Sequence, residues 1–418
     1  MPTGHTGIEE WISRILRSHG PNVRVAIAGL DCSVAALVTD IFCTPALEVS
    51  RELGVPGYVY FPSSVSMLAL LLRSPELDEE VAVEFEEMDG AVHIPGLPPV
   101  PPSALPTTML DRKKSTYDWF VSTGRGHMNA TGIIVNTAAE LEQSVLAAIA
   151  DGRCTRGVPA PTVYAIGPVI ALTPPLEQPH ECVRWLDAQP PASVLLVCFG
   201  SKGLLPPSKV REIATALERS GHRFLWVLRG PPKDSRHGAT GAHGRHTRRD
   251  APRGVLGEDQ GQGPRVADEG AAEGDPRDAL RLELHPREPL VRRADAAMTA
   301  RRRAALQRVY PGLHLGIAVP LEMDRRRDNF VEAAELERAV RSLMGGGEEG
   351  RKAREKAVEM KAVCRMAVEV GGSSSTAFQR LTEDIRRGAV SPMATAVDAD
   401  EGDSSGGVCG RGGCRRRR

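Results

Sequence analysis

Short apolar runs alternate with amphipathic segments up to about residue 230, and this alternation constrains the fold more than any other feature of the sequence. Four runs have the length, the β-branched content and the boundaries of buried strands: VAALVTDIF (34–42), YVYFPSS (58–64), GIIVNT (132–137) and TVYAIGPVI (162–170). Helical spacing of apolar residues predicts helices around these runs, over 6–30, 45–54, 64–74, 116–129 and 138–151. Because strands that alternate with helices form parallel sheets, we expect a parallel sheet with helices on both faces.

A second α/β unit is predicted after TPPLEQPHE (173–181), a segment typical of a linker. Its strands are SVLLVCFGS (193–201) and HRFLWVLRG (222–230), with a helix over 206–221 between them. Amphipathic helices return near the end of the chain, over 329–346, 349–372 and 373–387. The predicted organisation is a first domain over 1–172, a linker over 173–184, a second domain over 185–388 and a tail over 389–418.

The composition changes abruptly at about residue 241. Residues 241–312 contain fourteen Arg, no Lys and one aromatic residue, Tyr310, and only eleven of them are Val, Leu, Ile, Met or Phe. So few apolar residues do not bury enough surface to offset the entropy of ordering, and we expect disorder over 241–315 and in the tail. Asp and Glu are interspersed with the Arg residues, which argues against an Arg-rich arm that binds RNA.

Charge and cysteine usage exclude several classes of protein. The chain has 53 Lys and Arg and 53 Asp and Glu, so its net charge of zero argues against nucleic acid or a membrane surface as a partner of the whole chain. The sequence contains no run of about 18 apolar residues, so no membrane span is expected. The first twenty residues lack the apolar core of a secretory signal. Eight irregularly spaced cysteines are typical of a reducing compartment, so a cytoplasmic location is expected. Cys409 and Cys414 have no second pair elsewhere, which argues against zinc, and no metal is expected.

Six segments carry a resemblance to a known family: ALVTDIFCTPALEVSRELGVPGYVYF (36–61), HIPGLPPVPPSALP (93–106), GIIVNTAAELE (132–142), YAIGPVI (164–170), ECVRWLDAQPPASVLLVCFGS (181–201) and ALERSGHRFLWVLRGP (216–231). They resemble the plant secondary-product UDP-glycosyltransferases, which transfer sugars to flavonoids and other phenols. The resemblance covers roughly 6–240 and 316–388. It implies two doubly wound Rossmann-like domains of the GT-B type, both incomplete here, with the acceptor bound by the first domain and the nucleotide sugar by the second.

The resemblance also implies a reaction. A hexose, expected to be glucose, passes from a UDP-sugar co-substrate to a hydroxyl group of a small phenolic or flavonoid acceptor with inversion, and no cofactor is needed. In the family a histidine takes the proton of the acceptor hydroxyl, and a carboxylate holds that histidine. Asp40 matches the position of this relay carboxylate; the alternative is an ordinary N-cap of the helix that follows.

Further positions are assigned by the same resemblance. Gly200 and Ser201 match the turn that faces the diphosphate, where glycine permits close approach of the backbone and serine supplies a hydroxyl donor. The acceptor pocket is expected to be apolar, and its candidate residues are Phe61, Ser63, Ser64, Met67 and Phe120. For Met67 and Phe120 the alternative is a place in the helix core.

Two parts of the family pattern are absent from the sequence. The chain begins after the family's first strand, whose Gly-His turn supplies the base, and neither His5 nor His19 takes its place at a strand end. The W-A-P-Q, H-C-G-W-N-S and E-Q elements of the donor signature box are also missing. We therefore expect this polypeptide to be inactive. The alternative is a pseudoenzyme, a remnant that binds small molecules without catalysis.

A shifted reading frame accounts for the missing box. With one base dropped, suitable codons for GVLGEDQGQG (254–263) yield GFLERTKGRG, and those for LRLELHPREPL (280–290) yield CGWNSILESLW, the centre of the box. The same shift of the reading frame turns segment 270–277 into APQKEIL and segment 303–311 into EQRFNAFT. The hypothesis is a frameshifted or wrongly assembled coding region over about 241–315.

Overall fold

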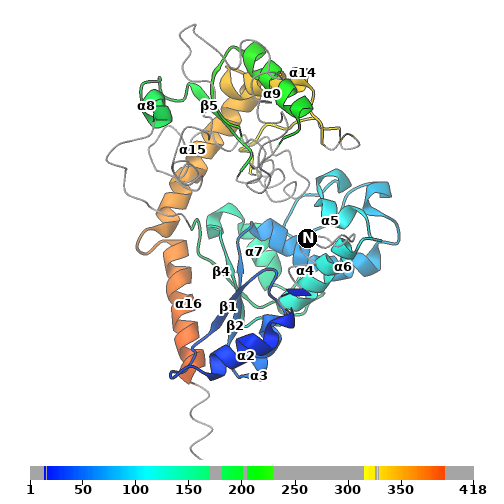
Figure 1. The fold of residues 1–418 in the computed structure, drawn as a ribbon, viewed down its shortest axis with the longest axis vertical. Coiled ribbons are helices and arrows are strands. Elements are labelled where there is room, and N and C mark those ends of the chain that lie inside the picture. The colour runs from blue at the N-terminus through cyan, green and yellow to red at the C-terminus, as the bar shows by residue number, and fades with distance from the viewer. Residues whose placement is uncertain are drawn as a thin grey trace, which may run out of the picture.

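The computed structural model describes residues 14–169 apart from Leu16, and residues 181–200, 205–228, 315–324, 327 and 329–390. Disorder was predicted over 241–315, and all of this range except residue 315 lies outside the described residues, as does most of the predicted linker. The predicted tail over 389–418 begins two residues too early, because residues 389 and 390 belong to the last helix; the rest of the tail lies outside the described residues. Figure 1 shows two α/β bodies, joined along one side by two long helices, α15 (Glu348–Val368) and α16 (Ser373–Val390). None of the helices in these ranges is long and apolar enough to cross a membrane.

The first body is built on a parallel sheet of four strands in the order β1-β2-β3-β4. The strands are β1 (Leu37–Asp40), β2 (Gly57–Phe61), β3 (Gly132–Val135) and β4 (Thr162–Ala165). Each strand pairs in parallel with the next, with Leu37 opposite Gly57 and Gly132 opposite Thr162. The predicted parallel sheet is therefore confirmed, with strands shorter than the apolar runs suggested.

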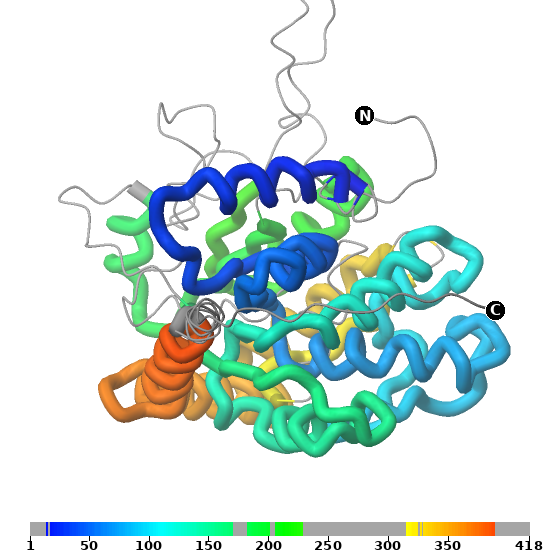
Figure 2. The backbone as a smooth tube through the Cα atoms, turned by 90° about the horizontal axis from the view of Figure 1, so that it is seen from below, coloured from blue at the N-terminus to red at the C-terminus, as the bar shows by residue number. Residues whose placement is uncertain are grey.

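Helices on one face of this sheet come from the connections between its strands: α3 (Ala46–Glu52), α4 (Val65–Glu80), α6 (Ser115–His127) and α7 (Gln143–Ala150). Apolar side chains of α4, α6 and α7 form one buried cluster with the sheet, which includes Phe61, Leu68, Phe120, Ile133 and Ile149, while α3 contacts β1 and β2. The short helix α5 (Thr107–Leu110) and the Pro-rich loop also contribute residues to this cluster. Val92 and Val100 form an isolated antiparallel bridge in this region. Figure 2 shows α4 and α6 on one side of the molecule and α15 and α16 on the other.

Helix α4 is longer than its sequence pattern indicates, because it continues through Pro75 to Glu80. Proline lacks the N–H that would bond the carbonyl four residues earlier, which here belongs to Leu71. The hydroxyl of Ser74 donates to this carbonyl at 2.8 Å and replaces the missing bond. Arg73 pairs with Glu76 and Glu80 across the next turns, so the prediction that the helix ends at residue 74 is wrong.

The opposite face of the first sheet is covered by α16, from the far end of the described chain. Leu381 packs against Tyr58, Ile134 and Tyr164 in a second buried cluster. The hydroxyl of Tyr164 donates to Asp384 Oδ2 at 2.6 Å. The predicted domain limits stay a prediction; the main contacts of this helix within the described residues are with β4 of the first body and with α15.

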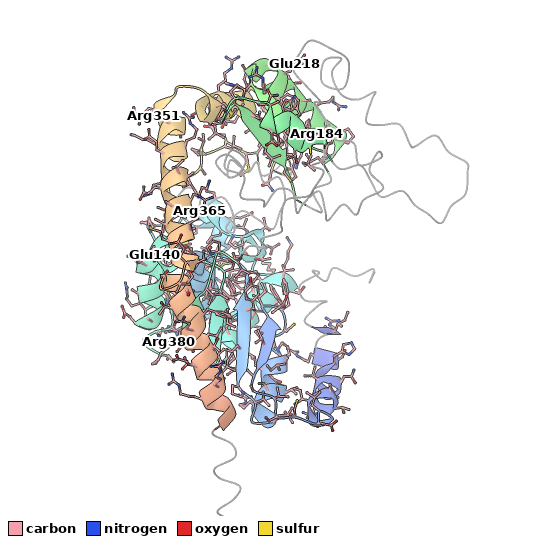
Figure 3. All side chains as sticks on the ribbon, turned by 90° about the vertical axis from the view of Figure 1, so that its left-hand side faces the viewer. Glu140, Arg184, Glu218, Arg351, Arg365 and Arg380 are labelled. Atoms are coloured by element: carbon pink, nitrogen blue, oxygen red, sulfur yellow. The ribbon has the colours of Figure 1, made fainter. Side chains whose placement is uncertain are left out.

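Two serines fix the beginning of α16. Ser374 donates its hydroxyl to the carbonyl of Gly167 at 2.5 Å, and Ser373 donates to Glu140 Oε2 at 2.8 Å. Figure 3 shows Glu140 beside the junction of α15 and α16, and Arg380 farther along α16. The helix is therefore held at its start and along its length by the end of the first sheet.

The second body contains two parallel strands among the described residues, β5 (Val194–Cys198) and β6 (Arg223–Val227). The helices α9 (Pro207–Ser220) and α14 (Ala333–Met344) pack on them, and α8 (Glu181–Asp187) precedes β5. Trp226, Leu217 and Leu336 are buried in their common core. Glu212 of α9 accepts a hydrogen bond from Ala333 N at 2.7 Å, which caps the first turn of α14.

Glu142 holds the start of α4 from across the fold. Its side chain is 4% exposed, and its carboxylate accepts from Val65 N at 3.0 Å, from Ser66 N at 2.8 Å and from Ser66 Oγ at 2.5 Å. Thr137 Oγ1 donates to the same carboxylate at 3.2 Å. A negative charge at a helix N-terminus satisfies free N–H groups and interacts favourably with the helix dipole.

Replacing Glu142 tests this cap. Glu142→Ala should lower the free energy of unfolding by about 3 kcal/mol, because several buried donors lose their acceptor. Glu142→Gln should cost about 1 kcal/mol, since the amide oxygen still accepts but the charge is lost. Urea denaturation followed by circular dichroism measures both, and Glu87→Ala, at an exposed glutamate of the first body, is the control with an expected loss of about 0.5 kcal/mol or less. Equal stability of the Glu142→Ala variant and the unmodified chain would contradict the cap.

A buried imidazole predicts a pH dependence of stability. His127 of α6 is fully buried, and its Nδ1 lies 2.7 Å from the carbonyl of Thr123, so this nitrogen carries the proton and donates. The ring of Phe61 lies edge-on at 5.9 Å. Burial disfavours the charged ring and lowers the pKa of His127 to about 4.

The unfolded chain therefore binds one more proton than the folded chain between about pH 6.5 and pH 4. The free energy of unfolding should fall by about 3 kcal/mol as the pH falls through this window, at 1.36 kcal/mol for each pKa unit. His127→Leu should remove this part of the slope in urea titrations at several pH values. Val121→Ala, in the same helix, should lower stability equally at every pH. An unchanged slope in the His127→Leu variant would show that His127 does not cause it.

Candidate functional site

The carboxyl ends of the four parallel strands lie at one edge of the first sheet, where open α/β sheets place their ligands. Asp40 ends β1, Ser63 and Ser64 follow β2, and Asn136 follows β3. Asn136 Oδ1 accepts from Val169 N at 2.7 Å, so this side chain fixes the segment that follows β4. The sheet thus brings the candidate relay carboxylate and two candidate acceptor residues to one edge.

The carboxylate of Asp40 is used by its own turn. Asp40 Oδ1 accepts from Phe42 N at 2.7 Å and lies 3.4 Å from Cys43 Sγ. Helix α3 begins at Ala46 with Pro45 in the N-cap position and no side-chain cap. The alternative that Asp40 is the N-cap of this helix is therefore wrong, because the carboxylate closes the turn that precedes it.

Cys43 is a poor nucleophile in this environment. Burial raises the pKa of its thiol to about 11, and the neighbouring charge of Asp40 adds to the increase. A thiol with such a pKa is protonated at neutral pH, whereas nucleophilic attack requires the thiolate.

Histidines do not pair with Asp40 within the described ranges. The hydrogen bonds of its carboxylate are to residues 42 and 43, while His19 Nδ1 contacts Asn22 Nδ2 at 2.8 Å. His5 lies outside the described residues, and His127 is enclosed in the core. A relay from Asp40 to a histidine is therefore not formed among these residues.

The two serines after β2 differ in their environment. Ser64 is the N-cap of α4, and its hydroxyl accepts from Met67 N at 3.3 Å. Ser63 is 9% exposed, and its hydroxyl has no hydrogen-bond partner among the described residues. Buried hydroxyl groups normally have a partner, so Ser63 has free hydrogen-bonding capacity at the edge where ligands bind.

The apolar candidates lie mainly in the core. Phe61 is 1% exposed and Phe120 is 3% exposed, and both belong to the cluster beneath the sheet. Met67 is partly buried and packs against the same cluster. The helix-core alternative for Phe120 and Met67 agrees with these positions, and the acceptor role of all three residues stays a prediction.

On the side of the second body, Gly200 follows β5 in a left-handed conformation, with φ of 75°. Among the described residues other than its chain neighbours, none has an atom within 4 Å of the position that a Cβ would occupy there, so the backbone is open on that side. Ser201, the second candidate at this turn, lies outside the described residues. Metal-binding clusters of three or more His, Cys, Asp or Glu do not occur in the parts of the chain that the structure describes.

Glu142 and Asn136 are the residues that the sequence prediction missed at this edge. Both lie in GIIVNTAAELE, a segment that carries the resemblance but suggests no role for any single residue. A glutamate before an apolar segment is common in sequences, so Glu142 gives no sign that its side chain is buried or that it caps another helix. The signal exists only in space, because the capped helix begins 77 residues earlier in the chain.

Comparisons with known proteins identify relatives along almost the whole chain. The malvidin galactosylase UGT88C3 of Oryza sativa subsp. japonica is 71% identical over 416 residues, which cover 93% of this chain and 83% of the relative. UDP-glycosyltransferase 88B1 of Stevia rebaudiana is 32% identical over 383 residues, which cover 87% of this chain and 78% of the relative. No family model matches the chain.

Solved structures give the same result for the fold. The structure of Phytolacca americana UGT2 complexed with UDP-2fluoro-glucose and pterostilbene has a TM-score of 0.72 at 27% identity and covers 92% of this chain and 84% of that one. A UDP-glucosyltransferase from Polygonum tinctorium has a TM-score of 0.72 at 28% identity, with 92% and 83% covered. The parallel sheets of both bodies agree with the predicted GT-B architecture. The chain therefore belongs to the plant UDP-glycosyltransferases, whose members use a UDP-sugar as co-substrate.

Proposed function

We propose that this chain derives from a hexosyltransferase that acts on a hydroxyl group of a small phenolic or flavonoid acceptor in the cytoplasm. The observation that carries the proposal is the 71% identity to a malvidin galactosylase over 93% of the chain. The structural neighbour that holds pterostilbene together with UDP-2fluoro-glucose supports a phenolic acceptor. Glucose is favoured only through the family resemblance, so a hexose is the proposed sugar, and both UDP-glucose and UDP-galactose belong in the test.

In this reaction the acceptor oxygen attacks the anomeric carbon, the bond from that carbon to the diphosphate breaks, and UDP leaves with inversion. Asp40 would hold the histidine that removes the acceptor proton. Gly200 and Ser201 would face the diphosphate, where an open backbone permits close approach. The acceptor pocket would be formed by Phe61, Ser63, Ser64, Met67 and Phe120. The hydroxyl of Ser63 has no partner among the described residues and could bond the acceptor.

We propose further that this polypeptide does not complete the reaction. The carboxylate of Asp40 closes its own turn and holds no histidine among the described residues. The sequence lacks the signature box that supplies uracil, ribose and sugar contacts in the family. Loss of a general base costs about 10²–10⁴-fold in rate, and loss of the donor contacts removes binding of the co-substrate.

A turnover assay tests both proposals. The purified chain, incubated with malvidin or a flavonol and with UDP-glucose or UDP-galactose, should give no glycoside by liquid chromatography. Glycoside that forms only with a UDP-sugar would refute the inactivity and support the family reaction. In that event Asp40→Asn should lower kcat by about 10²-fold or more, while Glu79→Gln, on the surface of α4, should leave it unchanged.

The second candidate function is binding of an apolar small molecule without catalysis. It is favoured by the first body, whose sheet is covered on both faces although the donor box is absent from the sequence. Titration with pterostilbene, followed by its fluorescence, should show saturable binding that Ser63→Val weakens. Absence of binding would exclude this function and leave the hexosyltransferase ancestry untouched.

The origin of the missing box has its own test. We propose that the nucleotides across codons 236–320 contain the box in a shifted frame, as four ordered segments indicate. Sequencing of the transcript should show the same disruption as the genomic DNA. A transcript with an uninterrupted box would place the error in the gene assembly and would remove the reason for inactivity on the donor side.

A further inference from the structure

The sequence contains two Asp-Gly dipeptides, Asp89–Gly90 and Asp151–Gly152. In such a dipeptide the main-chain nitrogen of the glycine can attack the side-chain carboxyl group of the aspartate, because glycine has no Cβ that hinders the approach. The attack also requires that the main chain be free to turn, and the structure places the two dipeptides in opposite environments.

The first dipeptide lies on the surface of the first body, between the short helix Phe85–Glu87 and the bridge formed by Val92. Asp89 and Gly90 are both exposed, as is the next residue, Ala91. Gly90 has φ of 95°, and among the described residues other than its chain neighbours none has an atom within 4 Å of the position that a Cβ would occupy. This bend is therefore open to water and unconstrained by packing at the glycine.

The second dipeptide ends helix α7 and is held in place. Asp151 is the C-cap residue, and its N–H donates to Ala147 O at 2.9 Å. Gly152 is buried, and its N–H donates to Ile149 O at 3.0 Å. A Cβ on Gly152 would lie 3.0 Å from Val158 O. The nitrogen that would have to attack is engaged in a hydrogen bond, and its peptide group turns only if this part of the chain opens.

We propose that Asp89 is a site of spontaneous isoaspartate formation, and that the fold protects Asp151 from the same reaction. The proposal is independent of the proposed function, because the reaction needs no ligand and no catalytic group of the transferase. It depends on the main-chain environment of the two glycines.

The reaction has two steps. The main-chain nitrogen of Gly90 bonds to the carboxyl carbon of Asp89, and one carboxyl oxygen leaves as water, which closes a five-membered succinimide ring. Water then attacks one of the two ring carbonyl groups and opens the ring. Attack at the carbonyl group that was the main-chain carbonyl of Asp89 leaves the chain linked through the former side chain, as isoaspartate; attack at the other restores aspartate. The water lost on closure is regained on opening, so no further reagent is consumed.

Isoaspartate adds one atom to the main chain and leaves a free α-carboxylate. The bend that receives the added atom lies between two anchored residues, since Phe85 is 0% and Val92 is 1% exposed. We therefore expect the change to be absorbed in the exposed bend, with the fold of the first body retained. The new α-carboxylate is the group that isoaspartyl carboxyl methyltransferases methylate with S-adenosylmethionine, so it offers a selective probe.

Ageing of the full chain at neutral pH and physiological temperature tests the proposal. Peptide mapping with electron-transfer dissociation distinguishes isoaspartate from aspartate at each position, although the masses are equal. Isoaspartate should form about tenfold or more faster at Asp89 than at Asp151, because ring closure at Asp151 first requires local opening. Equal rates at the two dipeptides of the folded chain, or a faster reaction at Asp151, would overturn the proposal.

Unfolding separates the effect of the fold from that of the local sequence. In guanidinium chloride both dipeptides lie in an open chain, so isoaspartate should form at similar rates at Asp89 and Asp151. A difference that persists undiminished in the unfolded chain would contradict protection by the fold.

Methyl transfer to the aged chain gives a second readout, with a matched pair of variants. Asp89→Glu should remove most of the methyl groups that the methyltransferase incorporates after ageing, because a glutamate side chain would have to close a six-membered ring, which forms far more slowly. Asp151→Glu, at the exposed aspartate of the protected dipeptide, should leave the incorporation unchanged. Equal incorporation into the two variants would show that Asp89 is not the reacting residue.

Discussion

The first sheet depends on one topological constraint, which is that its strands lie in sequence order. Connections between neighbouring parallel strands are right-handed, so successive connections in one direction place their helices on the same face. Helices α3, α4, α6 and α7 therefore share one face, and the other remains uncovered by them. Because both faces of a parallel sheet must be buried, a helix from elsewhere in the chain is needed, and α16 supplies it.

The same constraint explains where polar groups are buried. Helix α4 begins shortly after β2, and its first residues, Val65 and Ser66, are fully buried, so their N–H groups need acceptors within the protein. Glu142 reaches these groups from the connection after β3 and supplies the missing acceptors. The cap therefore fixes the start of the helix beside Ser63 and Ser64, and it links the stability of the core to the geometry of the candidate acceptor edge.

At the carboxyl edge of the first sheet, Asp40 lies where the resemblance predicts but lacks the contacts that catalysis needs. Asp40 stands at the end of β1, where the family resemblance places a relay carboxylate, yet its oxygen bonds the turn that follows. Gly200 has an open left-handed backbone, and its place beside the diphosphate stays a prediction. Membership of the family is established by sequence and fold, whereas catalysis requires partners for these groups that the described residues do not provide.

The alternation of strands and helices, the parallel pairing and the family could be predicted from the sequence, because local periodicity and motif residues carry that information. It misjudged α4, since nothing near Pro75 shows that Ser74 replaces the missing hydrogen bond. Three features became visible only in the folded chain: α16 covers the first sheet, Glu142 caps α4, and Phe61 lies in the core. These are contacts between residues tens to hundreds of positions apart, and their energies depend on a geometry that no local pattern encodes.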